Sequence, residues 1–191
     1  MTRIGRRIYG ASAAGLLLLL HAGAAYAATD VSDCRQLSGA NSTYRLVADL
    51  TSTGTCLEVV GDNITIDGNG HTITYTSDGA DQAAVYSRYA SGTIIHDLTV
   101  NMTSDMGGNG PSAIRTKGSV TVYNCNINVV QNGDGTVWGL SSLGSGERSI
   151  HHNTFYASGV GSVVNIQASG VSGTSKVSGS IHDNDSTLDG S

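Results

Sequence analysis

A repeat of about 28 residues is the feature that most constrains how this chain of 191 residues can fold. Each copy begins with a branched aliphatic residue followed by a short polar turn, and successive copies are 29, 27, 28 and 31 residues apart. The residues that mark the copies are Ile66, Ile95, Val122, Ile150 and Ile181. Self-similarity at such a period is typical of stacked units that bury their core against one another. The sequence therefore predicts a solenoid.

Short strands separated by turns make up each unit. The stretch 63–73 contains two alternating strands joined by a turn rich in Gly and Asn, and a third apolar patch precedes the next copy. These patches are residues 84–85, 113–114, 137–140 and 163–166. The chain has 26 Gly and 1 Pro, and no run of helical period follows residue 30. Three short strands per unit are the content of a parallel β-helix, so we expect an all-β solenoid of about six coils, about 4.8 Å apart.

Equivalent side chains of successive coils form ladders in such a fold. The five marker residues are expected to point inward. Three residues after a marker, Asn69, Asn153 and Asn184 are expected in the turn, where Asn tolerates left-handed backbone geometry and bonds to the next coil. Leu98 and Cys125 interrupt this Asn column.

The first 27 residues have the pattern of an export signal. Arg3, Arg6 and Arg7 form a basic region, residues 11–20 are apolar, and Ala25-Tyr26-Ala27 is a small-residue cleavage signal. We therefore divide the chain into a signal peptide (1–27), an N-terminal cap with the first coil (28–62) and the β-helix repeats (63–191). This division predicts a secreted or periplasmic protein. Since no later stretch has 18 or more apolar residues, we expect no membrane span.

Export also bears on the cysteines and on the charge. Cys34 and Cys56 lie close in sequence, and in an oxidising compartment we expect them to form a disulfide. The third cysteine, Cys125, is interpreted as a small buried hydrophobe. Loss of the three signal-peptide arginines leaves 7 Lys and Arg against 15 Asp and Glu, a formal net charge of −8. This charge argues against nucleic acid as a partner.

Two stretches carry a motif that resembles a known family: Ile64-Thr65-Ile66-Asp67-Gly68-Asn69-Gly70-His71-Thr72-Ile73 and Ile150-His151-His152-Asn153-Thr154-Phe155. They resemble the repeat of right-handed parallel β-helix proteins, the pectin-lyase-like superfamily, over residues 44–191. The resemblance implies a right-handed helix. That superfamily includes pectate and alginate lyases, polygalacturonases, uronan epimerases, phage tailspikes and adhesins, so the resemblance does not choose an activity. Its enzymes are usually longer, and we expect the C-terminal end to continue into further coils or to pack on them.

Titratable side chains recur directly after the marker residues. The first position holds Asp67, His96, Tyr123, His151 and His182, and the next holds Asp97, His152 and Asp183. Stacking would place His151 about 5 Å from His182. Because imidazoles and carboxylates are common metal ligands, the candidate metal site is His151, His152, His182 and Asp183. The alternative is that these are solvent-facing turn residues whose neutral imidazoles stack.

Cations recur in the turns that lead from the third strand of a coil back to the first, at Arg88, Arg115, Lys117, Arg148 and Lys176. Arg88 and Arg148 are candidate carbohydrate contacts, together with Tyr86 and Trp138, whose aromatic faces suit pyranose rings. The alternative is that these cations are scattered and only keep an acidic solenoid soluble.

The resemblance implies one further role for the cations. In lyases of the superfamily an Arg or Lys takes a proton from a uronic acid while calcium or another cation neutralises the carboxylate, which makes Arg115 and Lys117 the candidate catalytic residues. The adjoining outward positions offer no carboxylate cluster for calcium, so calcium is expected only if the chain is a lyase. These positions are Thr65, Ile94, Thr121, Ser149 and Ser180.

Three functional hypotheses follow. The first is an exported β-helix that binds or acts on extracellular polysaccharide, and the second is a non-catalytic structural or adhesive solenoid at the cell surface. The third is a lyase or epimerase acting on uronic acids. Hydrolysis is disfavoured because Asp97 and Asp183 are three coils, about 14 Å, apart, and because the Asn-Thr-Asp and Gly-His-Gly signatures of the family's hydrolases are absent.

Overall fold

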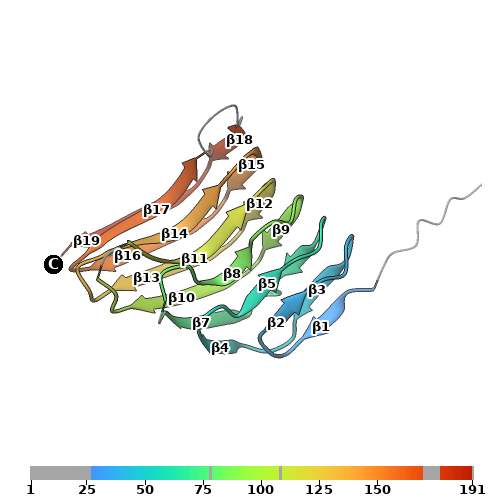
Figure 1. The fold of residues 1–191 in the computed structure, drawn as a ribbon, viewed down its shortest axis with the longest axis horizontal. Coiled ribbons are helices and arrows are strands. Elements are labelled where there is room, and N and C mark those ends of the chain that lie inside the picture. The colour runs from blue at the N-terminus through green and yellow to red at the C-terminus, as the bar shows by residue number, and fades with distance from the viewer. Residues whose placement is uncertain (1–26, 78, 108, 170–176, 191) are drawn as a thin grey trace, which may run out of the picture.

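The computed structural model describes residues 27–77, 79–107, 109–169 and 177–190. Within these residues the regular structure is β-strand, and nineteen strands form three parallel sheets that stack into a solenoid (Figure 1). The predicted all-β fold with three strands per coil is therefore confirmed. The expected signal peptide lies outside the described residues except for Ala27.

Each sheet runs along the length of the solenoid. Sheet A contains β1 (Thr29–Val31), β3 (Thr43–Leu46), β6 (Thr65–Asp67), β9 (Thr93–His96), β12 (Val120–Tyr123), β15 (Gly146–His151) and β18 (Val177–His182). Sheet B contains β2 (Arg35–Leu37), β5 (Leu57–Val59), β8 (Ala83–Ser87), β11 (Asn109–Lys117), β14 (Thr136–Leu143) and β17 (Ser162–Ser169). Sheet C contains β4 (Leu50–Thr53), β7 (Thr72–Ser77), β10 (Thr99–Ser104), β13 (Asn126–Gln131), β16 (Thr154–Gly159) and β19 (Asp185–Gly190).

The chain passes from sheet A to sheet C to sheet B and then returns to sheet A one coil further on. Five complete coils, from β3–β5 to β15–β17, are flanked in the described part of the chain by β1 and β2 at one end and by β18 and β19 at the other. The residues before β3 also form strands that extend the solenoid, since β1 pairs with β3 and β2 pairs with β5. The predicted cap region therefore begins with strands of sheets A and B.

The marker residues form the predicted aliphatic ladder inside the solenoid. The strand register pairs Ile66 with Ile95, Ile95 with Val122, Val122 with Ile150 and Ile150 with Ile181. The first four side chains are completely buried, whereas Ile181 is 50% exposed. Ile181 is exposed because β18 has a described neighbour on one side only.

The Asn column differs from its prediction in backbone geometry. Asn69 does adopt a left-handed conformation, but in later coils that conformation falls one residue earlier, at Asp97, Asn124, His152 and Asp183. Asn153 is buried and its amide bonds inward: Nδ2 donates to the Val122 carbonyl and to Asn184 Oδ1, and Oδ1 accepts from the Cys125 amide. The column therefore satisfies backbone groups inside the turn, with Leu98 and Cys125 buried where Asn is missing.

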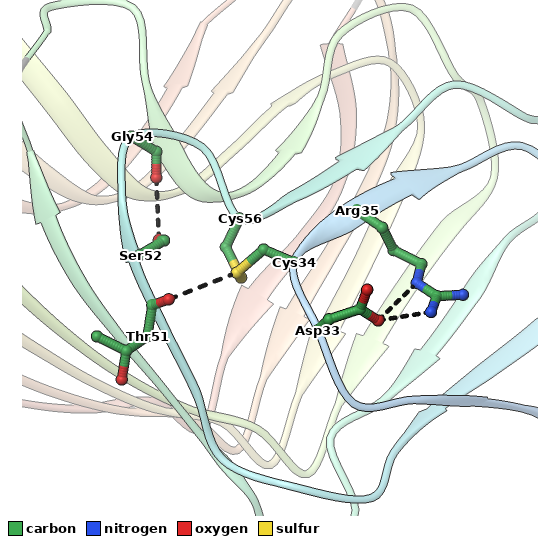
Figure 2. The surroundings of a disulfide bond; sticks show 7 residues. All are labelled: Asp33, Cys34, Arg35, Thr51, Ser52, Gly54 and Cys56. Carbon is green, nitrogen blue, oxygen red and sulfur yellow. Dashed lines mark hydrogen bonds and ion pairs between the residues drawn. A yellow bond between two sulfur atoms is a disulfide. The ribbon is translucent and has the colours of Figure 1, made fainter.

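A disulfide joins Cys34 and Cys56, as the sequence predicted (Figure 2). The two cysteines immediately precede β2 and β5, where Arg35 pairs with Leu57, so the bond links two neighbouring coils along sheet B. Closing this loop of 22 residues stabilises the fold by about 3 kcal/mol in the chain-entropy model. The crosslink fixes the terminal strand of the sheet to the coil below it.

Among the described residues no helix is long and apolar enough to cross a membrane.

Candidate functional site

The outer face of sheet B carries the cluster of candidate residues that the fold brings together most closely. Tyr86 on β8 faces outward, in register with Glu58 on β5 and with Arg115 on β11. The same outward column continues through Ser141 and Gln167, whose side chains are hydrogen-bonded at 3.0 Å. The column runs along the solenoid, so a linear polymer laid on it would meet one position per coil.

Three cations surround the ring of Tyr86. The Cζ atoms of Arg88 and Arg115 lie 5.0 and 5.8 Å from the ring centroid, and Lys117 Nζ lies 6.0 Å from it. These distances are within the range of cation–π attraction. The phenol of Tyr86 contributes most to raising the pKa of Arg88 above its usual value. Tyr86 itself is only 2% exposed beneath these cations; Arg88 and Lys117 are partly exposed, and the Arg115 side chain is 13% exposed.

Carboxylates at the edge of this cluster are few. Arg115 forms an ion pair of 2.8 Å with Asp81, whose side chain is 69% exposed. Glu58 lies beside Tyr86 in register and accepts a hydrogen bond of 3.2 Å from Gln36 Nε2. A calcium ion prefers six to eight oxygen ligands. Asp81 and Glu58 are engaged separately, and they do not form such a set.

Trp138 and Tyr89 are the aromatic side chains near this face that solvent can reach. Trp138 on β14 is half-buried and pairs in register with Ser112 and Val164, three positions along the strand from Ser141. It therefore lies about 10 Å along sheet B from the column of Tyr86. Tyr89 follows Arg88 and is 81% exposed. Tyr89 is the better-exposed platform for a sugar ring.

Arg148 lies inside the solenoid and not among the surface cations. It pairs with Val120, an inward position of sheet A, and is 2% exposed. Its Nε donates to Ser142 Oγ at 2.6 Å and its Nη2 donates to the Gly144 carbonyl at 2.6 Å. Burial lowers the pKa of Arg148. A buried guanidinium cannot contact a polymer, so Arg148 is removed from the carbohydrate-binding set, and Lys176 lies outside the described residues.

The second candidate region is the edge between sheets A and C, where the aromatic side chains that directly follow the marker residues stack on one another. His96 and Tyr123 stack with centroids 5.0 Å apart, Tyr123 and His151 at 5.4 Å, and His151 and His182 at 5.3 Å. The interplanar angles are 8–10°. We call these four side chains the ring column. The strand register produces it directly, because each ring occupies the last residue of a sheet A strand.

The left-handed residue after each histidine turns its side chain back to that histidine. Nδ1 of His96 lies 2.8 Å from Asp97 Oδ2, and Nδ1 of His182 lies 2.7 Å from Asp183 Oδ2. In the coil before that of His182, Nδ1 of His151 lies 2.8 Å from Nδ1 of His152. The ring of His152 is nearly perpendicular to those of His151 and His182, at 88° and 80°. His152 therefore stands beside the ring column and spans two coils.

The charges at this edge influence each other. Burial lowers the pKa of His151, and the neighbouring His152 and His182 lower it further against an opposing effect of Asp183. The hydrogen bond from His182 holds the pKa of Asp183 below its usual value. Burial raises the pKa of Tyr123, with a further contribution from the carboxylate of Asp97.

Two groups at this edge have metal-ligand chemistry. The predicted group of His151, His152, His182 and Asp183 is brought together in pairs: besides the contacts above, His152 Nε2 lies 3.9 Å from Asp183 Oδ2. The second group was not singled out as a metal site from the sequence. Its members are Asp67, His96 and Asp97, whose ligand atoms all lie within 4.8 Å of one another. Alignment of coils places Asp67 beside His96, so the repeat itself contained that signal.

Asp67 is already occupied by other partners. Burial alone would raise its pKa, but hydrogen bonds from Arg45 Nε and from the Asn69 amide, both 2.9 Å, bring the pKa below its usual value. The guanidinium of Arg45 thus neutralises part of the charge that would attract a cation to this group.

The outer face of sheet A has a hollow of about 320 Å³, lined by Ile94, Thr121, Ser149 and their neighbours. These are the outward positions that the sequence assigned to this strand, and the register confirms that they form one column. Glu147 supplies the carboxylate of the lining.

Cys125, the remaining cysteine, is buried and unpaired. Burial raises the pKa of its thiol to about 12. Such a thiol is not a nucleophile at neutral pH, which agrees with its interpretation as a core residue.

No family model matches this chain, and no curated protein or solved structure that was compared with it matches either.

Proposed function

We propose that this chain is an exported β-helix of the pectin-lyase-like type that binds an anionic extracellular polysaccharide along the outer face of sheet B. The proposed contacts are Arg88, Arg115 and Lys117, with Tyr89 as a stacking platform. The family rests on the repeat motif and the coil architecture, and export rests on the N-terminal pattern and the disulfide.

The observation that carries the proposal is the concentration of positive charge in one place. Only 7 Lys and Arg follow residue 27, against 15 Asp and Glu, and three of those seven surround Tyr86. Cations that served only solubility would be expected to spread over the surface. Guanidinium groups bind carboxylates and sulfates with matched pairs of donors, which suits an anionic sugar polymer.

Binding is favoured over elimination at this cluster. A catalytic base must release its proton, and Arg115 is held by the carboxylate of Asp81 at 2.8 Å. The described residues near Arg115 and Lys117 also lack a convergent carboxylate set for calcium. We therefore propose binding, and the test below also detects lyase activity.

Retardation in affinity gels tests the proposal. The chain is run in gels containing polygalacturonate, alginate, chondroitin or, as a neutral control, dextran. We expect retardation by at least one anionic polymer, and an affinity at least tenfold weaker, about 1.4 kcal/mol, in the triple variant Arg88→Ala, Arg115→Ala, Lys117→Ala. Added salt should weaken binding because it screens exposed charges.

Two matched variants separate the cluster from general charge effects. Arg35→Ala removes an exposed cation on β2, the edge strand of sheet B two strands from β8, where Arg35 pairs with Asp33, and this variant should bind like the parent chain. Tyr86→Phe keeps the ring and should also bind. If the triple variant is retarded as strongly as Arg35→Ala, or if no anionic polymer retards the parent chain, the proposal fails and the structural solenoid becomes the better account. A rise in absorbance near 235 nm with the polymers would instead identify a lyase.

A further inference from the structure

We propose that the edge between sheets A and C binds one divalent transition-metal ion through His152 Nε2, His182 Nδ1 and Asp183 Oδ2, with His151 orienting His152. Zn²⁺ is the ion that the donor set of two imidazoles and one carboxylate suits. The site is separate from the cation cluster on sheet B, so the two proposals can fail independently.

His152 occupies a distinctive position at this edge. Its neighbours in the ring column stack as equivalent side chains of an in-register solenoid do, but His152 stands nearly perpendicular to them. Its Nδ1 faces the Nδ1 of His151 at 2.8 Å, and its Nε2 lies on the side of Asp183, 3.9 Å from Oδ2. Two facing nitrogens at that distance require one N–H. If His152 Nδ1 donates to His151, its Nε2 carries the lone pair toward Asp183.

Metal-binding histidines usually use one nitrogen for the metal and donate the other N–H to a neighbouring group, which fixes the tautomer. His151 is the acceptor of that kind here. The sequence predicted His151 as a metal ligand together with the other three residues of the group, whereas the contacts give His151 a positioning role.

The candidate ligand atoms lie around Asp183 Oδ2. Zn²⁺ binds nitrogen and oxygen at 2.0–2.2 Å, which places tetrahedral ligand atoms about 3.3 Å apart. Asp183 Oδ2 lies 2.7 Å from His182 Nδ1 and 3.9 Å from His152 Nε2, whereas the ring centroids of His152 and His182 are 6.2 Å apart, so the two imidazoles have to turn toward the ion. The three side chains are 49–64% exposed, which leaves room for this rotation. Three protein ligands leave a fourth position for water.

The backbone beneath these side chains is fixed. His152 and Asp183 hold left-handed conformations at φ of 56° and 51°. The His152 amide donates to the Asp183 carbonyl at 2.9 Å, and Asn184 Nδ2 donates to the Ile150 carbonyl at 2.9 Å. The two Cα positions that carry the ligands are therefore set before any ion binds, so only side-chain rotation has to be ordered.

Binding involves a proton. In the absence of metal, His182 Nδ1 and Asp183 Oδ2 share a proton at 2.7 Å. On binding, His182 Nδ1 loses that proton and donates its electron pair to the ion. A neutral imidazole then carries its N–H on Nε2, whereas an imidazolium keeps its Nε2 proton and releases the Nδ1 proton to the solvent. The ion takes the place of that shared proton.

The group of Asp67, His96 and Asp97 is the competing site, and it is less suited to a transition metal. It offers one imidazole instead of two, and its Asp67 carboxylate is paired with Arg45. Imidazole favours Zn²⁺, Cu²⁺ and Ni²⁺, whereas carboxylates alone favour Mg²⁺ and Ca²⁺. Among the described residues, the ion pairs of His152, His182 and Asp183 join these side chains to one another and not to a Lys or Arg.

Titration calorimetry with Zn²⁺ alone, on the chain without a polyhistidine tag, tests this site. We expect one equivalent to bind, with affinity at least tenfold weaker in His152→Ala and in His182→Ala, the order of loss seen when metal sites are disturbed. Two variants serve as controls and should bind normally: His71→Ala, whose imidazole contacts Asp49, and His96→Ala, which removes the competing site. Circular dichroism of each variant confirms that the fold is retained.

The role of His151 needs its own readout. His151→Ala should weaken binding less than His152→Ala, and His151→Asn, which keeps an acceptor, should restore it. The proposal is overturned if the parent chain binds no Zn²⁺, if His152→Ala binds as the parent does, or if His96→Ala abolishes binding. Equal losses in His151→Ala and His152→Ala, with no rescue by Asn, would make His151 a ligand and overturn the assigned geometry.

Discussion

Replacing Asn153 with Ala should destabilise the solenoid more than any other single change in its Asn column. Asn153 is 1% exposed, and its Oδ1 accepts the Cys125 amide at 3.0 Å while its Nδ2 donates at 3.0 Å to the Val122 carbonyl. Alanine leaves the buried Cys125 N–H without that partner, which costs about 1–3 kcal/mol. Each of the lost Nδ2 bonds adds about 0.5–1.5 kcal/mol, so we expect a total of about 3 kcal/mol.

Urea unfolding followed by circular dichroism measures this loss. Asn184→Ala is the matched comparison. Asn184 donates from Nδ2 to the Ile150 carbonyl and accepts at Oδ1 from the amide and Nδ2 of Asn153, but it is only partly buried, so water can replace some of these bonds. The change should cost about 1–2 kcal/mol, less than Asn153→Ala. Asn101→Ala is the control, since its contact with Asn128 is exposed, and it should cost less than about 0.5 kcal/mol. The reasoning is refuted if Asn153→Ala unfolds at the same urea concentration as Asn101→Ala, or if Asn184→Ala costs more than Asn153→Ala.

Three further predictions concern the cysteines and the buried arginine. Replacing Cys34 and Cys56 together with Ala should lower the free energy of unfolding by about 3 kcal/mol, measured in urea, and the reductant that lowers the stability of the parent chain should leave this variant unchanged. Cys125, whose thiol has a pKa of about 12, should be about one part in 10,000 thiolate at pH 8 and should react with a disulfide reagent only after unfolding. Arg148→Ala should destabilise by about 2–3 kcal/mol, because Ser142 Oγ and nearby carbonyls lose a buried charged donor, while polymer retardation stays normal. The first prediction is contradicted if the variant without Cys34 and Cys56 is as stable as the parent chain, and the second if the Cys125 thiol is labelled rapidly in the folded chain. The third is contradicted if Arg148→Ala selectively loses polymer binding.

The sequence predicted the fold well because one coil equals one repeat. Aligning the marker residues was enough to place His96, Tyr123, His151 and His182 in one column, since parallel in-register strands convert sequence equivalence into stacking. The same alignment did not show the ring of His152 crossing the column. That orientation depends on a left-handed backbone residue, which the alignment of side chains does not reveal.

Arg148 shows a different kind of limit. A charged residue near a turn was assigned to the surface, but Arg148 lies two residues before the inward Ile150, and side chains two apart on a strand share a face. The alternation of side chains along the strand therefore indicated that Arg148 points inward. Its charge led to the wrong assignment to the surface. No strands were predicted for residues 29–37, because strands of three residues, such as β1 and β2, are too short to show alternation.

The sequence placed Arg115 and Lys117 in one candidate set and Arg88 and Tyr86 in another, and it did not bring the three cations together around Tyr86. The register of β8 and β11 places Arg115 beside Tyr86. Arg88 and Lys117 lie beyond the residues paired between these two strands, where side-chain reach and not strand register decides the contact.

The most direct test of the proposed function is to map where a uronate oligosaccharide binds. In a titration of ¹⁵N-labelled protein, backbone amide shifts locate the contact surface independently of any substitution. We predict that the largest shifts occur at Tyr86, Arg88, Arg115 and Lys117, with the ring column unchanged. Shifts confined to the hollow on sheet A or to the ring column, with the residues around Tyr86 unperturbed at saturation, would contradict the account.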